Sequence, residues 1–168
     1  MGTGWEEVYA GQYRRLVAVL TAIAGTRQEA EEAVQEAFVR ALGLTGRRAV
    51  VDDPEAWLYR VAVNVLRSRW RRTVLGRRAA ARMSAAGMDH AATGPPDSRL
   101  ALLAALKRLP FEQREALALH YFADLPLAEI ADRTGAPIGT VKARLSRGRD
   151  ALARLLADDS VDGGTRRA

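Results

Sequence analysis

Residues 127–145 read LAEIADRTGAPIGTVKARL and contain a short helical pattern, a glycine and a second helical pattern. Ala131 is small enough to let two helices approach, Gly135 suits a left-handed turn, and Val141 can pack the second helix inward. A small residue, a turn residue and a buried residue in this order are what a helix-turn-helix requires. The stretch therefore predicts two helices joined by a tight turn.

The second of these helices has an apolar seam and a basic exterior. Residues 142–154 contain five Lys or Arg against one Asp. A recognition helix presents its N-terminal half to the major groove and its flanks to phosphates. We therefore favour duplex DNA binding over an ordinary helical hairpin with a basic exterior. The seam is Val141, Leu145, Gly148, Leu152 and Leu155, and the residues predicted to face DNA are Thr140, Lys142, Arg144, Ser146, Arg147 and Arg149.

A second basic cluster lies upstream, where residues 57–78 contain seven arginines and no acidic residue. Unmixed charge on a surface helix repels itself, so this pattern favours a polyanionic partner over a solvated basic face. Arginine suits phosphate and guanine edges, and asparagine can pair with adenine. The residues predicted to bind nucleic acid are Arg60, Asn64, Arg67, Arg71 and Arg72. For Trp57 and Trp70, core packing is the better interpretation than stacking on an unpaired base.

The periodicity is helical along most of the chain, and no convincing strand pair is present. We expect a first helix over residues 6–24. A capping box of Thr26 and Glu29 should begin a second helix, and Pro54 should begin a third that ends near residue 72. The predicted buried stripes are Ala30, Ala33, Val34, Ala37, Phe38, Ala41 and Leu42 in the second helix, and Leu58, Val61, Ala62, Val65 and Leu66 in the third.

These elements predict an all-α fold of two small helical domains joined by a flexible linker. Residues 1–75 form an N-terminal helical bundle, and residues 99–157 form a C-terminal helix-turn-helix domain. The linker, residues 76–98, is rich in Ala, Gly and Arg and ends near the helix-breaking pair Pro95 and Pro96, so we expect it to be partly helical at its start and flexible at its end. Residues 158–168 are predicted to be a disordered tail.

Composition restricts the function classes. The chain has 168 residues, a net charge of +6 and no cysteine, which excludes disulfides, thiolate zinc sites and cysteine nucleophiles. We see no signal peptide and no apolar run of about 18 residues that could span a bilayer, so we expect a cytoplasmic protein.

Enzymatic chemistry has little support in the sequence. A small nuclease would need converging carboxylates or histidines around a metal. His90 lies in the linker, His120 fits the edge of a core, and Asp52 with Asp53 fits a turn and helix cap better than a metal site. We therefore expect no catalytic residue, no metal and no cofactor.

The second helix carries an acidic face of Glu29, Glu31, Glu32 and Glu36. This face is either a plain solvated surface with a favourable helix dipole or a surface for a protein partner. A negative helix beside a positive one suits a protein better than it suits DNA.

Taken together, three segments resemble the compact, two-domain extracytoplasmic-function sigma factors of bacterial RNA polymerase. EAEEAVQEAFVRAL (residues 29–42) is similar to the family's polymerase-docking helix. PEAWLYRVAVNVLRSRWRR (residues 54–72) is similar to its minus-ten helix. LPFEQREALAL (residues 109–119) and GTVKARLSRGR (residues 139–149) resemble its minus-thirty-five domain. Val63 and Ser68 depart from the family pattern, which often has Arg and Asp there.

The resemblance implies a transcription initiation factor that binds core RNA polymerase, through the clamp helices and flap of the large subunits. It also implies promoter DNA as duplex and melted strand, a probable anti-sigma factor, and a nucleoid location within the holoenzyme. Asn64, Arg67 and Arg71 fall where the family reads and melts the minus-ten element. The segment implied to dock on polymerase contains Glu32, Val34, Gln35, Glu36 and Phe38.

The main alternative is a conventional operator-binding regulator that uses its helix-turn-helix as a dimer on a palindromic site. It explains residues 109–156 equally well, but it leaves the arginine stripe and the acidic face without a role.

Overall fold

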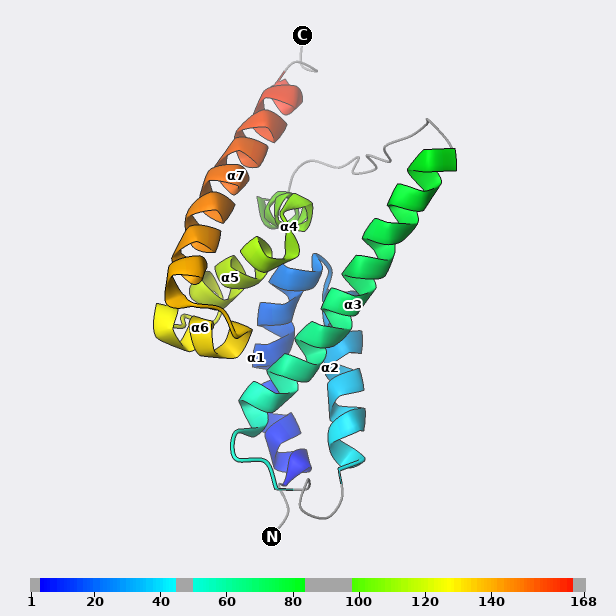
Figure 1. The fold of residues 1–168 in the computed structure, drawn as a ribbon, viewed down its shortest axis with the longest axis vertical. Coiled ribbons are helices and arrows are strands. Elements are labelled where there is room, and N and C mark those ends of the chain that lie inside the picture. Colours follow the sequence, from blue (N-terminus) through cyan, green and yellow to red (C-terminus); the bar gives the residue numbers. More distant parts are fainter. Residues whose placement is uncertain (1–3, 45–49, 84–97, 165–168) are drawn as a thin grey trace.

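The computed structural model describes residues 4–44, 50–83 and 98–164, which form α-helices and contain no strand. This confirms the predicted all-α class. The helices are α1 (Trp5–Ala24), α2 (Arg27–Leu42), α3 (Pro54–Met83), α4 (Ser98–Arg108), α5 (Phe111–Tyr121), α6 (Leu127–Thr134) and α7 (Ile138–Gly164). Helices α1, α2 and α3 lie side by side as one bundle, and α4 to α7 form a second unit beside it (Figure 1).

Local sequence signals determine where the N-terminal helices begin and end. Gly25 closes α1 in a left-handed conformation, φ 87°, and its N–H donates to the carbonyl oxygen of Thr21 at 2.8 Å. The Thr26 hydroxyl accepts the Glu29 N–H at 3.2 Å and caps α2, which is one of the two bonds of the predicted capping box. The Asp53 carboxylate accepts the Ala56 N–H at 2.9 Å at the start of α3, which agrees with its predicted capping role.

The bundle core follows the predicted stripes, with two exceptions: Val61 of α3 is only half-buried, and Leu42 of α2 is exposed. Ala30, Ala33, Val34, Ala37, Phe38 and Ala41 are buried, and so are Leu58, Ala62, Val65 and Leu66 of α3. Leu42 was predicted to be buried but is 67% exposed. It is the last residue of α2.

Two helices are longer than predicted. α3 ends at Met83 instead of near residue 72, and the first residues of the linker are helical, as predicted. Residues 73–83 contain no proline and several alanines and arginines, so extending an existing helix costs little. α7 likewise reaches Gly164, although a disordered tail was predicted from residue 158. The rest of the linker, residues 84–97, and residues 165–168 lie outside the described residues.

The C-terminal unit contains the predicted helix-turn-helix. Gly135 has φ 64°, so it provides the left-handed turn between α6 and α7. Val141 and Leu145 are buried, and Leu152 and Leu155 are half-buried on the same seam. A Cβ at Gly148 would lie 3.0 Å from Leu117 Cδ1, so the absence of a side chain lets α7 lie closely against α5.

The two units pack directly against each other. α5 and α4 lie against α1, and α5 also meets α3, so that buried side chains from both units form one hydrophobic cluster (Figure 1). The sequence predicted the two units but treated them as separate bodies on a tether. The contact between them determines how the candidate DNA-binding residues are presented.

Candidate nucleic-acid interface

The predicted minus-ten residues lie along α3, but they differ in exposure. Arg60, Asn64, Arg71 and Arg72 are exposed, so their side chains are available to a ligand. Arg67 is different, because its side chain is only 26% exposed and lies against the C-terminal unit. The stripe predicted from residue spacing is therefore present, with one member engaged inside the protein.

A second stripe on α3, which sequence reasoning missed, faces the C-terminal unit. It consists of Tyr59, Val63, Arg67 and Trp70, and we call it the interdomain stripe. Tyr59 and Val63 are almost fully buried, whereas Trp70 is half-buried. Val63 is one of the two departures from the family pattern, and its apolar side chain suits this covered position.

The interdomain stripe packs against Phe111 and Glu115, which lie one helical turn apart on α5. Arg67 Nη2 lies 2.8 Å from Glu115 Oε2, and the Tyr59 hydroxyl donates to Glu115 Oε1 at 3.2 Å. The Arg67 guanidinium also lies 5.1 Å from the centroid of the Phe111 ring, and the Trp70 ring is 6.0 Å from it. The Trp70 contact supports the core-packing interpretation.

Burial at this contact shifts the pKa values of Glu115 and Tyr59. Glu115 is 1% exposed, and burial raises the pKa of its carboxyl group, against the opposing effects of Arg67 and the Tyr59 hydroxyl. Burial also raises the pKa of Tyr59 well above its usual range, helped by Glu115. Arg67 Nε is buried without a hydrogen-bond partner among the described residues. Both carboxylate oxygens of Glu115 therefore have a hydrogen-bond partner, whereas one N–H of the Arg67 guanidinium has none among the described residues.

A second buried charge on α5 joins the two units. Arg114 is 2% exposed, and its Nη1 donates to the backbone carbonyl of Ile23 at 2.8 Å. That carbonyl lies in the last turn of α1, where carbonyls have no partner within the helix. Burial lowers the pKa of Arg114, with Glu29 and Glu112 opposing this effect. Sequence reasoning missed Arg114, because a charged residue on a helix is ordinarily assigned to solvent.

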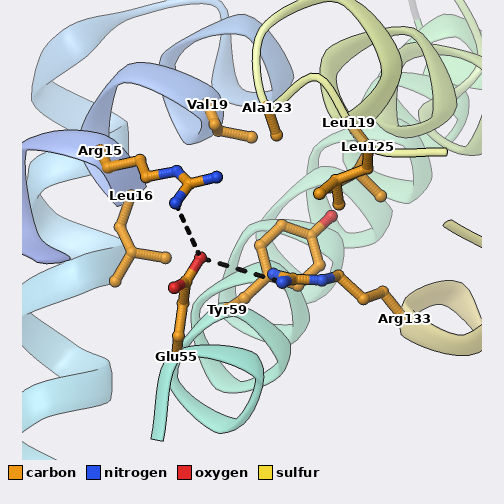
Figure 2. A pocket seen from close by; sticks show the side chains of 9 residues that line it. All are labelled: Arg15, Leu16, Val19, Glu55, Tyr59, Leu119, Ala123, Leu125 and Arg133. Carbon is orange, nitrogen blue, oxygen red and sulfur yellow. Dashed lines mark ion pairs between the residues drawn. The ribbon is translucent and has the colours of Figure 1, made fainter. Parts of the chain in front are cut away.

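Glu55 makes a further link between the units. Figure 2 shows its carboxylate between the guanidinium groups of Arg15 and Arg133, at 3.9 and 3.8 Å. Arg133 belongs to α6 and also lies 5.8 Å from the centroid of the Tyr59 ring. The ion pair between Arg133 and Glu55 therefore links α6, the first helix of the helix-turn-helix, to the N-terminal turn of α3.

A cavity of about 280 Å³ separates the middle of α3 from the helix-turn-helix. Arg60, Asn64 and Arg67 line one side, and Asp132 to Gly135 line the other. A space of this size is near the lower limit of small-molecule sites. The cavity therefore separates the predicted minus-ten face of α3 from α6 and the turn, and none of the predicted minus-thirty-five residues of α7 lines it.

The predicted outward face of α7 is largely confirmed. Thr140, Lys142, Ser146, Arg147 and Arg149 are exposed, whereas Arg144 is half-buried. Arg144 lies close enough to Glu115 to lower the pKa of that carboxyl group. The basic face therefore remains open to solvent except near the interdomain contact.

The predicted docking face of α2 divides into surface and core residues. Glu32, Gln35 and Glu36 are exposed, but Val34 is 0% exposed and Phe38 is 6% exposed. Glu32 forms an ion pair with Arg69 of α3 at 2.9 Å, which joins the acidic and basic helices directly. Glu36 pairs with Arg40 within α2.

The remaining candidates occupy structural positions. His120 is half-buried, and its Nδ1 lies 3.3 Å from the carbonyl oxygen of Leu125, as expected for a residue at the edge of a core. Trp57 packs against Trp5 with ring centroids 5.5 Å apart. His90 lies outside the described residues.

No group of three or more His, Cys, Asp or Glu in the described part of the chain could hold a metal ion. None of the described helices is long and apolar enough to cross a membrane.

Comparison with known families gives two matches that cover the two helical units. Residues 8–74 match the model of Sigma-70 region 2, and residues 99–152 match that of Sigma-70, region 4. The extracytoplasmic-function (ECF) RNA polymerase sigma factor SigW of Bacillus subtilis is 30% identical, over 91% of this chain and 84% of the relative. The ECF RNA polymerase sigma factor SigM of Mycobacterium tuberculosis is also 30% identical, over 90% of this chain and 76% of the relative.

Solved structures share the fold. The sigma factor RpoE in complex with the anti-sigma factor NepR, from Bartonella quintana, has a TM-score of 0.64 at 24% identity, covering 90% of this chain and 96% of that chain. CnrH in complex with the cytosolic domain of CnrY has a TM-score of 0.60 at 22% identity, covering 92% and 88%.

Proposed function

This chain belongs to the extracytoplasmic-function sigma factors of RNA polymerase, and we propose that its two basic helices divide promoter recognition between them. α7 contacts the minus-thirty-five duplex through its exposed basic face. α3 captures the melted minus-ten strand through Asn64, Arg71 and the neighbouring arginines. The observation that carries this proposal is the presence of two separate basic faces, one on each helical unit of a single chain.

Promoter opening in this proposal requires no chemical step by the sigma factor. A surface that binds the open strand more tightly than the duplex shifts the equilibrium toward the open state. Arginine and asparagine side chains supply phosphate contacts and base-edge hydrogen bonds for that purpose. The protein therefore acts as a binding factor and not as an enzyme.

Docking on core polymerase uses the exposed acidic part of α2, which is Glu32, Gln35 and Glu36. Val34 and Phe38 act indirectly in this proposal, because their buried side chains hold α2 in the bundle. The clamp helices of the polymerase receive α2, and the flap receives the C-terminal unit. The assembled holoenzyme works at the nucleoid, in the cytoplasm.

An inhibitory protein partner is part of the proposal. RpoE and CnrH, which share this fold, were solved with NepR and CnrY, and NepR is an anti-sigma factor. Their sequence identity to this chain supports the fold alone, so the partner of this chain has to be found experimentally. Co-purification of the full chain from its native cells, followed by inhibition of transcription with the captured protein, provides the test.

Run-off transcription with purified bacterial core polymerase and genomic promoter fragments tests the main proposal. Discrete transcripts should appear only when this chain and core polymerase are both present. Absence of initiation, together with unaided binding to a palindromic duplex, would refute the proposal in favour of a conventional regulator.

Two charge reversals test the division of labour. Arg71→Glu should reduce strand opening, measured as permanganate reactivity of unpaired thymines, more than it reduces recruitment of polymerase to the promoter. Lys142→Glu should reduce recruitment and make it less sensitive to salt. Arg14→Glu, an equal charge change at an exposed α1 residue, is the control and should change neither step. Equal loss of both steps from either reversal contradicts the assignment.

A further inference from the structure

The cavity of about 280 Å³ between α3 and α6 has unpaired polar groups on two opposite walls. Arg60 and Asn64 of α3 are exposed on one wall, and Asp132 of α6 is exposed on the other. None of these three side chains forms a hydrogen bond or ion pair with another described residue. Their polar groups are therefore available to a ligand in the cavity.

The other charged residues that line the cavity are already paired. Arg67 Nη2 lies 2.8 Å from Glu115 Oε2, and Arg133 Nη2 lies 2.9 Å from Glu129 Oε1. These pairs leave one cation on the α3 wall and one carboxylate on the α6 wall without a partner among the described residues. A ligand that satisfies both walls needs an anionic group at one end and a hydrogen-bond donor at the other.

The α3 wall suits a phosphate next to a base edge. The Arg60 guanidinium has only donors, in a fork that matches two oxygens of a phosphate. Asn64 lies one helical turn further on, about 6 Å along the helix axis. Its amide has both a donor and an acceptor, which can pair with the ring nitrogen and the exocyclic amine of adenine. Phosphate and adenine are therefore the groups that this wall recognises together.

The α6 wall offers acceptors and space. The cavity meets the last turn of α6, from Asp132 to Gly135, where helix carbonyls lack intrahelical partners and carry the negative end of the dipole. The Thr134 hydroxyl donates to the Ile130 carbonyl at 2.7 Å, so it can only accept from a ligand. A Cβ at Gly135 would meet nothing within 4 Å. This wall therefore suits an amino group.

We propose that this cavity binds an adenine mononucleotide. The phosphate binds Arg60, the adenine edge pairs with Asn64, and the second hydrogen of the adenine amine goes to Asp132. A space near the lower limit of small-molecule sites suits a single nucleotide and not a longer one. The inference goes beyond the proposed function, because binding requires neither promoter DNA nor polymerase and is measured on the chain alone.

Calorimetric titration of the full chain with adenosine monophosphate (AMP) tests the site. Binding should saturate at one AMP per chain. Adenosine lacks the phosphate and inorganic phosphate lacks the base, so each should bind at least about tenfold more weakly. Inosine monophosphate (IMP) has a carbonyl oxygen in place of the amine and should lose a similar factor, because Asp132 then faces an acceptor. No saturation up to about 10 mM AMP, or equal affinity for AMP and IMP, would overturn the proposal.

Two variants assign the two ends of the ligand. Arg60→Gln should weaken AMP binding at least about tenfold and leave adenosine binding almost unchanged. Asp132→Asn should bring the affinities for AMP and IMP close together, because an amide can donate to the IMP carbonyl. An unchanged preference for AMP over adenosine in Arg60→Gln, or over IMP in Asp132→Asn, contradicts the proposed orientation and overturns the site.

Matched controls separate the cavity from general charge effects. Arg77→Gln makes the same change at an exposed α3 residue outside the cavity. Asp124→Asn does so in the other unit, at an exposed residue whose φ of 55° asparagine also adopts. Both should leave AMP affinity unchanged, and circular dichroism checks the helical content of every variant. Equal weakening by Arg77→Gln and Arg60→Gln would show that AMP binds the basic surface of α3 in general, which overturns the cavity site.

Discussion

Replacing Arg114 with methionine should loosen the packing of the two units. The Arg114 guanidinium is buried and donates to the Ile23 carbonyl at 2.8 Å, whereas its second bond, to the Leu109 carbonyl, is 3.4 Å and weak. A hydrogen bond from a charged donor contributes about 1.5–3 kcal/mol, and Arg114→Met also leaves the Ile23 carbonyl unsatisfied in an apolar contact. Relief of the desolvation of the arginine offsets part of this loss. We expect a net loss of about 2 kcal/mol.

The tryptophans distinguish one unit and its contact from the whole chain. Trp5, Trp57 and Trp70 all lie in α1 and α3, and Trp70 also contacts Phe111, so tryptophan fluorescence follows the N-terminal unit and its contact with α5, while circular dichroism follows both units. In urea, the two probes should give coincident transitions for the original chain, because docking couples the units. In Arg114→Met the transitions should separate, and the midpoint should fall by about 1 M at a slope near 2 kcal/mol/M.

Arg15→Met is the matched control. Arg15 is 57% exposed and lies 3.9 Å from Glu55, a geometry in which an ion pair contributes about 0–1 kcal/mol. Arg114→Met must therefore destabilise clearly more than Arg15→Met and must also separate the two probes. A free energy of unfolding within about 0.5 kcal/mol of the Arg15→Met value, with coincident transitions, would show that the Ile23 bond does not hold the units together.

Three further changes test other features. Burial raises the pKa of Glu115 above its ordinary value of 4.5 despite Arg67 and Tyr59, so its contribution to stability is present below pH 4.5 and is lost as pH rises through the raised value. Urea unfolding at several pH values should therefore show a flatter profile for Glu115→Gln than for the original chain. Gly135→Ala should cost about 1–2 kcal/mol in thermal unfolding because φ is 64°, and Gly135→Asn should cost less. Thr26→Ala should cost about 1 kcal/mol in the same assay, whereas Thr26→Ser should retain the cap.

Local pattern predicted most of the helices and both basic faces. The seam of α7 and the stripe of α2 were visible because each helix buries one face at steps of three and four residues. Gly135 was visible because a left-handed turn favours glycine. Such features depend on near neighbours in the sequence, and the structure confirms them.

Contacts between distant segments could not be predicted in the same way. Tyr59, Val63 and Trp70 add a second covered face to α3, but periodicity does not indicate which element covers it. Arg114 and Glu115 are charged, and on an isolated helix they would have been assigned to solvent. Their partners are 91 and 48 residues away in the chain, at Ile23 and Arg67. Only the packed arrangement identifies them as interface residues.

The length of α3 has a consequence for the kinetics of docking between the two units. Beyond Trp70 the helix continues to Met83 as an arm about 20 Å long, at 1.5 Å per residue (Figure 1). Residues 84–97, whatever their conformation, can span at most about 50 Å from its tip to the start of α4. Rejoining of the units is therefore a unimolecular event at a high effective concentration, independent of how many copies the cell contains. Dilution therefore does not separate α3 from α5.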